Sequence, residues 1–233
     1  MANLLQNNIS IVIPTLNAEN TISDLIKSLN NKFYEIIIVD GNSSDRTVEI
    51  CKKYTSKICY SQPGRGIQMH LGSTISNSAW ILFLHSDSIL DKNCIDQIKH
   101  FINNFKNINK AGVFKLRINH NYFLARIIEK FANTRSRLLG LPYGDQGLLI
   151  SKKFYNKIGG FSPLSIMEDV CIIRTIGSKN VIILDSYIKT SPKNYIKDGW
   201  IRRSFKNIFC LILYFLGLNN KLIYKIYYGY KVK

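Results

Sequence analysis

"ILFLHSDSIL", residues 81–90, is an apolar run that ends in polar side chains, at His85, Ser86, Asp87 and Ser88. Its apolar part lacks the alternation of a strand with one solvated face, so it indicates a strand that is buried on both faces. Such strands belong to parallel sheets that are covered by helices. In these sheets ligands bind beyond the carboxyl ends of the strands. The stretch therefore predicts that Asp87 lies at a ligand-binding edge.

The remainder of the first half repeats this pattern. Apolar runs that predict strands alternate with segments of helical periodicity, and this alternation is typical of an α/β fold with a mostly parallel, Rossmann-like sheet and helices on both faces. Asp40, like Asp87, directly follows a buried run, so we expect both carboxylates in the same crevice. The predicted strands are 9–14, 34–40, 57–60 and 80–85, and the predicted helices are 17–31, 44–54 and 66–77.

The second half is less regular, with predicted strands at 112–118 and 146–151 and a helix at 122–139. From about residue 194 the chain has the pattern of basic, aromatic, amphipathic helices, at 199–218 and 221–230. We therefore expect a domain of residues 1–190 and a helical tail of residues 191–233. Two interpretations of the tail stay open: helices that lie on an anionic membrane, or helices that pack on the domain with a solvated basic face.

The chain of 233 residues carries a net charge of +17. The segment 189–233 alone has ten Lys and Arg against one acid, which is +9. This charge favours an anionic partner, namely nucleic acid, a phosphorylated substrate or an acidic membrane surface, although a composition rich in Lys, Asn and Ile also accounts for it.

The cysteines and the apolar segments indicate a cellular setting. Five scattered cysteines without a C-x-x-C pair predict reduced thiols and a cytoplasmic protein. Residues 1–8 lack the features of a secretory signal, and the longest apolar run, 208–218, is too short for an ordinary transmembrane helix.

Several motifs carry candidate chemistry. Asp40 opens the turn "DGNSSDRT", where its carboxylate can accept hydrogen bonds from a base or a ribose, or simply cap the turn. Asp87 is a candidate ligand for Mg²⁺ or Mn²⁺, and His85 either assists it or merely ends the strand. "GRGIQM", residues 64–69, places two glycines and Arg65 before a helix, which suits a phosphate or ribose.

Two further motifs place carboxylates in the second half, "YGDQG" at 143–147 and "MEDV" at 167–170. A carboxylate near a bound anion can serve as a general base. The alternative is that Glu168 and Asp169 only complement the dipole of a helix that begins there.

Taken in order over residues 9–175, these motifs resemble the family-2 inverting glycosyltransferases of GT-A fold. Within that family the chain looks most similar to the radical-SAM/selenodomain-associated subgroup, which likewise has G-R-x-x-Q-M and F-L-H-x-D. The resemblance implies a transferase of hexosyltransferase type. Such an enzyme moves a sugar from a UDP or GDP sugar to an acceptor hydroxyl, with inversion and with a divalent metal, Mn²⁺ or Mg²⁺.

The resemblance also implies roles for particular residues. Asp169, beside Glu168, matches the catalytic base. Asp87 matches the last acid of the D-x-D metal motif, whose first acid is replaced here by His85. Pro14, Thr15 and Glu19 match the first nucleotide-binding segment, and Asp40 matches the carboxylate that holds the base. We expect further nucleotide contacts from Asn17, Gly41, Asn42, Asp45, Arg65, Gly66, Gln68 and Ser86. We expect acceptor or phosphate contacts from Asp145, Gln146, Arg202 and Arg203.

The Q-x-x-R-W motif of processive members is absent, so we do not expect polymer synthesis. A peripheral position at the inner face of the membrane would suit a lipid-linked acceptor. Three other functions remain as alternatives. For a nucleic-acid-binding module there is no supporting motif, and we expect no nucleic acid partner. A nucleotidyltransferase would carry a glycine-rich phosphate loop. An inactive scaffold is disfavoured by the intact Asp40, Asp87 and Asp169.

Overall fold

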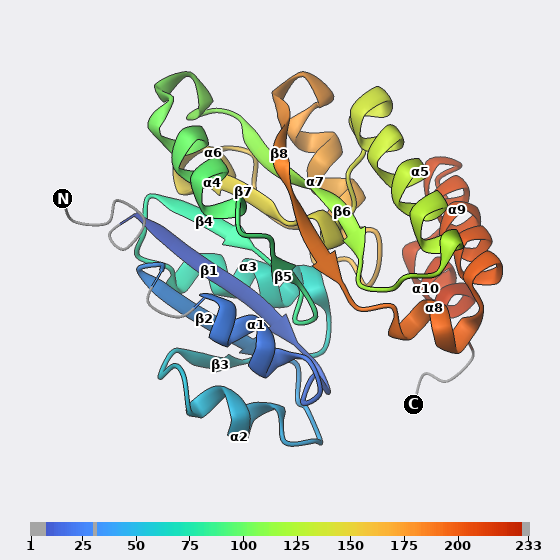
Figure 1. Cartoon of the computed structure of the whole chain (residues 1–233), viewed down its shortest axis with the longest axis horizontal. Helices are drawn as coiled ribbons and strands as arrows, with labels where there is room; N and C mark the ends of the chain where they lie inside the picture. Colours follow the sequence, from blue (N-terminus) through green and yellow to red (C-terminus); the bar gives the residue numbers. More distant parts are fainter. Residues whose placement is uncertain (1–7, 30–31, 230–233) are drawn as a thin grey trace.

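The computed structural model describes residues 8–29 and 32–229. Its centre is one twisted sheet in the order β3-β2-β1-β4-β7-β6-β8-β5, with helices on both faces (Figure 1). The first four strands of that order run parallel: β1 (Ile9–Thr15), β2 (Glu35–Asp40), β3 (Ile58–Tyr60) and β4 (Trp80–Phe83). The predicted mostly parallel sheet is therefore confirmed.

The second half of the chain extends this sheet. β7 (Leu148–Ser151) lies antiparallel between β4 and β6 (Ala111–Ile118). β8 (Val181–Thr190) runs parallel to β6, and the short β5 (Ile89–Leu90) is antiparallel to β8. As a result, the ends of β4 and β8 bring Asp87 and Thr190 together, although 103 residues separate them.

Ten α-helices surround the sheet in the described residues. They are α1 (Ile22–Leu29), α2 (Thr47–Lys52), α3 (Arg65–Ile75), α4 (Cys94–Asn103), α5 (Phe123–Leu139), α6 (Lys152–Lys157), α7 (Glu168–Ile176), α8 (Lys193–Asp198), α9 (Trp200–Phe215) and α10 (Asn220–Tyr228). Short 3-10 turns occur at Phe105–Asn107, Gly144–Gln146 and Ser178–Asn180.

Alternate residues of the central strands enter two separate cores, one on each face of the sheet. Ile11 and Ile13 of β1 pack on one side with Leu25 of α1, whereas Val12 packs on the other side with Met69 of α3. All five side chains are buried. This two-sided burial explains why the strands have no polar alternation.

The predicted helices at 17–31 and 44–54 both begin too early. α1 starts at Ile22 because Asn17 adopts a left-handed backbone (φ 51°) and its side chain accepts a hydrogen bond from the backbone of Ser44. α2 starts at Thr47, whose backbone N–H donates to Asp45 Oδ1 (3.0 Å). Residues 30–31 of the first predicted helix and residue 230 of the last lie outside the described residues.

The C-terminal basic helices are present as α8, α9 and α10. Cys210 of α9 and Ile223 of α10 are buried against Ile166, Met167 and Val170, which flank the start of α7. The C-terminal helices therefore contact the domain beside the end of the sheet, at the right of Figure 1. Within the described residues, no helix is both long and apolar enough to span a bilayer.

Gly72 of α3 allows this helix to approach β1 closely. A Cβ atom at this position would lie 2.3 Å from Val12 Cγ1, in the middle of the sheet. We expect Gly72→Ala to lower the free energy of unfolding by about 1–3 kcal/mol, because overpacking outweighs the better helix propensity of alanine. Urea unfolding followed by circular dichroism measures this change.

Thr74→Ala on the exposed side of α3 is the matched control, and we expect it to leave the unfolding midpoint nearly unchanged. Equal stability of the two variants would mean that α3 can move away from the sheet at little cost.

Candidate active site

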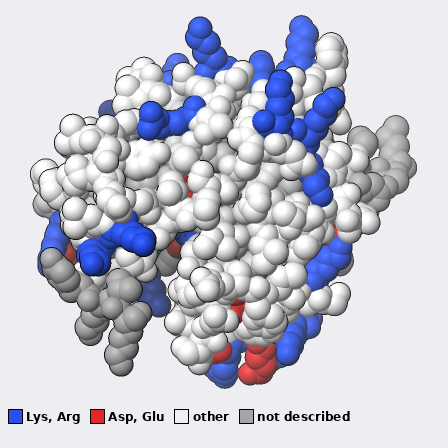
Figure 2. Space-filling model, turned by 180° about the vertical axis from the view of Figure 1, so that it is seen from behind, with Lys and Arg blue, Asp and Glu red and all other residues white. Residues whose placement is uncertain are grey.

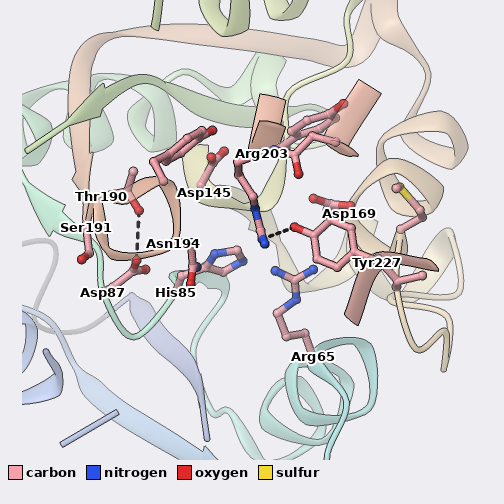
Figure 3. A pocket seen from close by; sticks show the side chains of 15 residues that line it. Arg65, His85, Asp87, Asp145, Asp169, Thr190, Ser191, Asn194, Arg203 and Tyr227 are labelled. Atoms are coloured by element: carbon pink, nitrogen blue, oxygen red, sulfur yellow. Dashed lines mark hydrogen bonds between the residues drawn. The ribbon is translucent and has the colours of Figure 1, made fainter. Parts of the chain in front are cut away.

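Two adjoining cavities lie at the carboxyl edge of the sheet. The larger has a volume of about 840 Å³ and the smaller about 140 Å³. Both are lined by Arg65, His85, Asp87, Ser191 and Asn194, so they form one continuous cleft. Figure 3 shows the small cavity, into which side chains from both halves of the chain converge.

Six of the predicted nucleotide-binding residues line the large cavity: Pro14, Thr15, Asn17, Arg65, Gln68 and Ser86. They come from the ends of β1 and β4 and from the start of α3. Gln68 is held in place because its Nε2 donates to the carbonyl oxygens of Thr15 (2.8 Å) and Val39 (2.7 Å). This amide therefore fixes the relative position of the first two strand ends.

Asp40 lies beneath this surface rather than on it. Its side chain is 1% exposed and accepts hydrogen bonds from Thr15 Oγ1 (2.9 Å) and from the backbone N–H of Ser43 (2.8 Å). Gly41 packs against Gln68, since a Cβ there would lie 3.1 Å from Nε2. In this structure Asp40 orders the loop after β2, which is the turn-capping alternative drawn from the sequence.

Three more predicted residues, Glu19, Asn42 and Asp45, lie in the loops around Asn17. Asn17 Oδ1 accepts from the backbone of Ser44 (2.9 Å), and Asp45 Oδ2 accepts from the backbone of Glu19 (3.1 Å). Asn42 has a left-handed backbone (φ 65°) in the same turn. Glu19, Asn42 and Asp45 do not line either cavity.

The "GRG" motif joins α3 to α7. Arg65 Nε lies 2.7 Å from Glu168 Oε1, and the Glu168 side chain is 1% exposed. A Cβ on Gly66 would lie 2.4 Å from the carbonyl oxygen of Ser162, so this glycine is needed for close packing. Burial raises the pKa of Glu168 and Arg65 opposes this rise. Glu168 therefore positions Arg65 and does not itself reach the cavities.

Asp169, by contrast, lines the small cavity. Its Oδ2 accepts from the backbone N–H of Gly144 (2.8 Å) and its Oδ1 from its neighbour Val170 (2.8 Å), which fixes the carboxylate plane. Gly144 also touches His85, because a Cβ there would lie 2.7 Å from His85 Nε2. A side chain at position 144 would thus collide with His85.

The two candidate acceptor-binding residues in the "YGDQG" motif lie in different environments. Asp145 lines the small cavity, and its buried Oδ1 has no hydrogen-bond partner among the described residues. Burial raises the pKa of Asp145 to about 6, with Arg135 opposing and Asp169 adding to the shift. Gln146 is fully buried and donates to the carbonyl oxygen of Phe114 (2.8 Å), outside both cavities.

The two tail arginines also differ. Arg203 lines the small cavity and pairs with Asp198 (2.8 Å). It also donates a hydrogen bond to the hydroxyl of Tyr227 (Figure 3). Arg202 is exposed and lines neither cavity.

The donor atoms near Asp87 are compatible with a divalent cation. Asp87 Oδ2 accepts a hydrogen bond from Thr190 (3.1 Å), and the buried Nε2 of His85 has no hydrogen-bond partner among the described residues. Burial and Arg65 lower the pKa of His85 to about 4, so the imidazole is neutral at pH 7, the form that ligates metals. No three His, Cys, Asp or Glu side chains of the described chain gather into a metal site by themselves. Mg²⁺ commonly combines one or two carboxylates with substrate phosphates.

The sequence did not point to the cations and aromatic residues that the C-terminal helices place in the large cavity. Lys193, Lys221 and Lys225 line it, together with Tyr224 and Tyr228. The only signal was the basic, aromatic composition of the tail, which also fits a membrane surface. These three lysines outnumber the one acid of the lining, Asp87, and such an excess of positive charge favours anions.

A comparison with protein families agrees with this geometry. Residues 10–162, more than half of the chain, match the Glycosyl transferase family 2 model. The chain belongs to this family, and the resemblance drawn from its motifs is confirmed at the family level.

Two curated relatives match this chain over only part of their own length. The chain is 32% identical over 157 residues to an uncharacterized glycosyltransferase of Rickettsia bellii, which covers 66% of this chain and 49% of that protein. It is 26% identical over 125 residues to the poly(ribitol-phosphate) beta-N-acetylglucosaminyltransferase TarS of Staphylococcus aureus, which covers 45% of this chain and 22% of TarS. The chain thus spans about half or less of the length of these relatives.

Solved structures confirm the GT-A type fold. Residues 1–349 of S. aureus TarS superpose with a TM-score of 0.61 at 18% identity, covering 94% of this chain and 69% of that one. A second match is glucosyl-3-phosphoglycerate synthase of Mycobacterium tuberculosis, solved in complex with Mn²⁺, UDP-glucose and phosphoglyceric acid. Its TM-score is 0.56 at 18% identity, and the match covers 77% of this chain and 69% of that one.

Because the pKa of Asp145 is raised from 3.8 to about 6, the folded state binds a proton that the unfolded state releases between these values. The contribution of Asp145 to stability is therefore present below pH 4 and is lost as the pH rises through 6. Asp145→Asn removes the free-energy cost of ionising this buried carboxyl. We therefore expect the substitution to raise the free energy of unfolding by about 1–3 kcal/mol at pH 8 and by much less at pH 4. Urea unfolding at the two pH values measures both differences.

Asp185→Asn is the control, because Lys115 lowers the pKa of this exposed carboxyl. We expect no gain in stability from it at pH 8. If Asp145→Asn raised the free energy of unfolding equally at pH 4 and pH 8, Asp145 would not be held in an unfavourable ionised state.

Proposed function

We propose that the chain is an inverting, non-processive glycosyltransferase of hexosyltransferase type. It would move a sugar from a nucleoside diphosphate sugar in the large cavity to an acceptor hydroxyl in the small cavity. The observation that carries this proposal is that Asp87 and Asp169 face the same cleft beside Arg65. The radical-SAM/selenodomain-associated subgroup stays a proposal that rests on the motifs of residues 64–69 and 83–87 alone.

A uridine nucleotide is the donor that we favour over a guanosine one. The fold neighbours include structures of TarS with UDP and with UDP-GlcNAc, and of glucosyl-3-phosphoglycerate synthase with UDP-glucose. The nucleotide would lie along Thr15 and Gln68. Asp40 is covered by Thr15 and Ser43, so it would reach the base only after a shift of the loop that follows β2.

In the proposed reaction Asp169 accepts the proton of the acceptor hydroxyl. The hydroxyl oxygen attacks the anomeric carbon from the face opposite the diphosphate, and the bond from that carbon to the phosphate oxygen breaks. The backbone N–H of Gly144 keeps the Asp169 carboxylate aimed into the cavity. Arg65 and the lysines of the large cavity stabilise the negative charge that develops on the diphosphate.

Asp87, with His85, would hold the divalent cation, and the diphosphate oxygens would complete its coordination. When bound, Mn²⁺ or Mg²⁺ supplies positive charge that stabilises the leaving diphosphate.

For the setting of the enzyme we propose the surface of an anionic membrane on its cytoplasmic side, with a lipid-linked acceptor. The support is the excess of Lys and Arg in residues 189–233 and the exposed apolar side chains of α9. All five cysteines lie in the described residues and are unpaired, which agrees with a reducing compartment.

We expect Asp87→Ala to abolish the Mn²⁺-dependent part of UDP binding, because the cation loses its protein carboxylate. Calorimetric titration with UDP and with GDP, each in Mn²⁺ and in EDTA, measures this effect and identifies the nucleotide. Asp91→Ala, a carboxylate four residues further along and outside both cavities, is the control. Binding of neither nucleotide by the folded wild-type chain would count against the transferase.

We expect Asp169→Asn to reduce sugar transfer at least 10³-fold while UDP affinity changes less than about threefold, because only the proton acceptor is lost. The release of UDP, measured during donor hydrolysis and during transfer to added acceptors, provides the rate. Calorimetry provides the affinity. Loss of both together would show that Asp169 belongs to the donor site instead.

A further inference from the structure

A third cavity, with a volume of about 480 Å³, lies between α5 and α9. We call it the apolar groove. Ile127 and Phe131 of α5 form one wall, and Ile201, Phe205 and Ile208 of α9 form the other. Phe131 is 74% exposed and Phe205 is 69% exposed. Aromatic side chains that are this open to water, on two facing helices, mark a surface that binds an apolar partner.

The apolar groove leads directly into the small cavity of the candidate active site. Tyr143, Asp145, Tyr195 and Asn207 line both spaces. Tyr195 is stacked on Trp200 of the groove, with ring centroids 5.3 Å apart and planes 18° apart. A molecule in the groove would thus have one end beside Asp169, the proposed base.

The junction of the two spaces contains polar atoms that need partners. Asp145 Oδ1 and Asn207 Oδ1, from residues that line both spaces, are buried and have no hydrogen-bond partner among the described residues. The same holds for Nη2 of Arg135, which lines the groove. Leaving such atoms unpaired is costly, so a ligand with a polar end at this point would be favoured. The apolar walls and the polar junction together fit an amphiphilic molecule with a hydroxyl-bearing head.

The surroundings of the groove suit the surface of an anionic membrane. Figure 2 shows a broad uncharged surface on the side of the C-terminal helices, with more Lys and Arg than Asp and Glu around it. Arg202 of α9 is exposed and adds a cation to the helix that forms one wall of the groove. A lipid could enter the groove from such a surface without crossing water.

We propose that the apolar groove binds the hydrocarbon chain of a membrane-lipid acceptor, and that its hydroxyl head lies in the small cavity next to Asp145 and Asp169. This inference rests on the proposed transferase function and specifies its acceptor class. Chain binding itself is independent of the transfer reaction, which allows the two to be tested separately.

Trp200 provides a direct readout. The chain has two tryptophans, and the other, Trp80, is 7% exposed in the core. We expect 11-bromo-1-undecanol, whose bromine quenches nearby indoles, to quench Trp200 fluorescence saturably. The short 3-bromo-1-propanol should do so at least 10-fold more weakly, because it buries little apolar surface. In Trp200→Phe the saturable quenching should disappear.

The double variant Ile127→Gln/Ile208→Gln tests the site. We expect the apparent Kd for 11-bromo-1-undecanol to rise about 10-fold, since both walls lose apolar contact. Leu138→Gln is the matched control, because Leu138 is an exposed aliphatic residue on the same helix α5 but does not line the groove. Both substitutions are at exposed positions, so the fold should be retained.

Quenching that is linear in quencher, independent of chain length, or equal in the groove and control variants would overturn the inference. Calorimetric titration with UDP and with GDP separates it from the proposed function. Binding of either nucleotide without saturable chain binding rejects the groove site and leaves the transferase standing. Saturable chain binding without binding of either nucleotide supports the groove site and rejects the transferase.

Discussion

One ion pair, between a buried carboxylate and a partly exposed guanidinium, connects the two halves of this site. Arg65 begins α3 in the first half of the chain, and Glu168 begins α7 in the second half, directly before Asp169. Because an isolated buried carboxylate is strongly disfavoured, Glu168 requires the guanidinium beside it. The pair therefore fixes the distance between the nucleotide-facing strand ends and the proposed base. Gly66 and Gly144 provide the close backbone approaches that make this arrangement possible.

In the large cavity, cations outnumber carboxylates. Its lining has one acid, Asp87, and Arg65 is paired with Glu168. The uncompensated positive charge comes from the lysines of α8 and α10 around the large cavity. An incoming nucleoside diphosphate would thus bring negative charge to a region with an excess of cations, which favours association electrostatically.

The sequence predicted the first half of the fold well, because two-sided burial produces continuous apolar runs such as residues 81–84. It missed α4 and β8, and it misplaced the starts of α1 and α2, where side chains of Asn17 and Asp45 bind the backbone and delay the helix. Within the site, Asp87, Asp169 and Arg65 were predicted and do converge. The sequence could not show that Glu168 and Gln146 lie outside the cavities. A residue's position in a motif does not reveal whether its side chain points into the cavity or into the core. The lysines of α10 could not be placed without knowing how the tail packs.

The large cavity is enclosed by residues near both ends of the described chain, from Pro14 after β1 to Tyr228 at the end of α10. A nucleotide bound there would bridge the first strand and the last helix, so its binding energy would be coupled to the docking of the whole C-terminal region. During synthesis on the ribosome, the complete binding surface would form only after α10 has emerged. Donor binding would then act as a late check on folding, since a chain that stops short of α10 lacks one wall of the cavity.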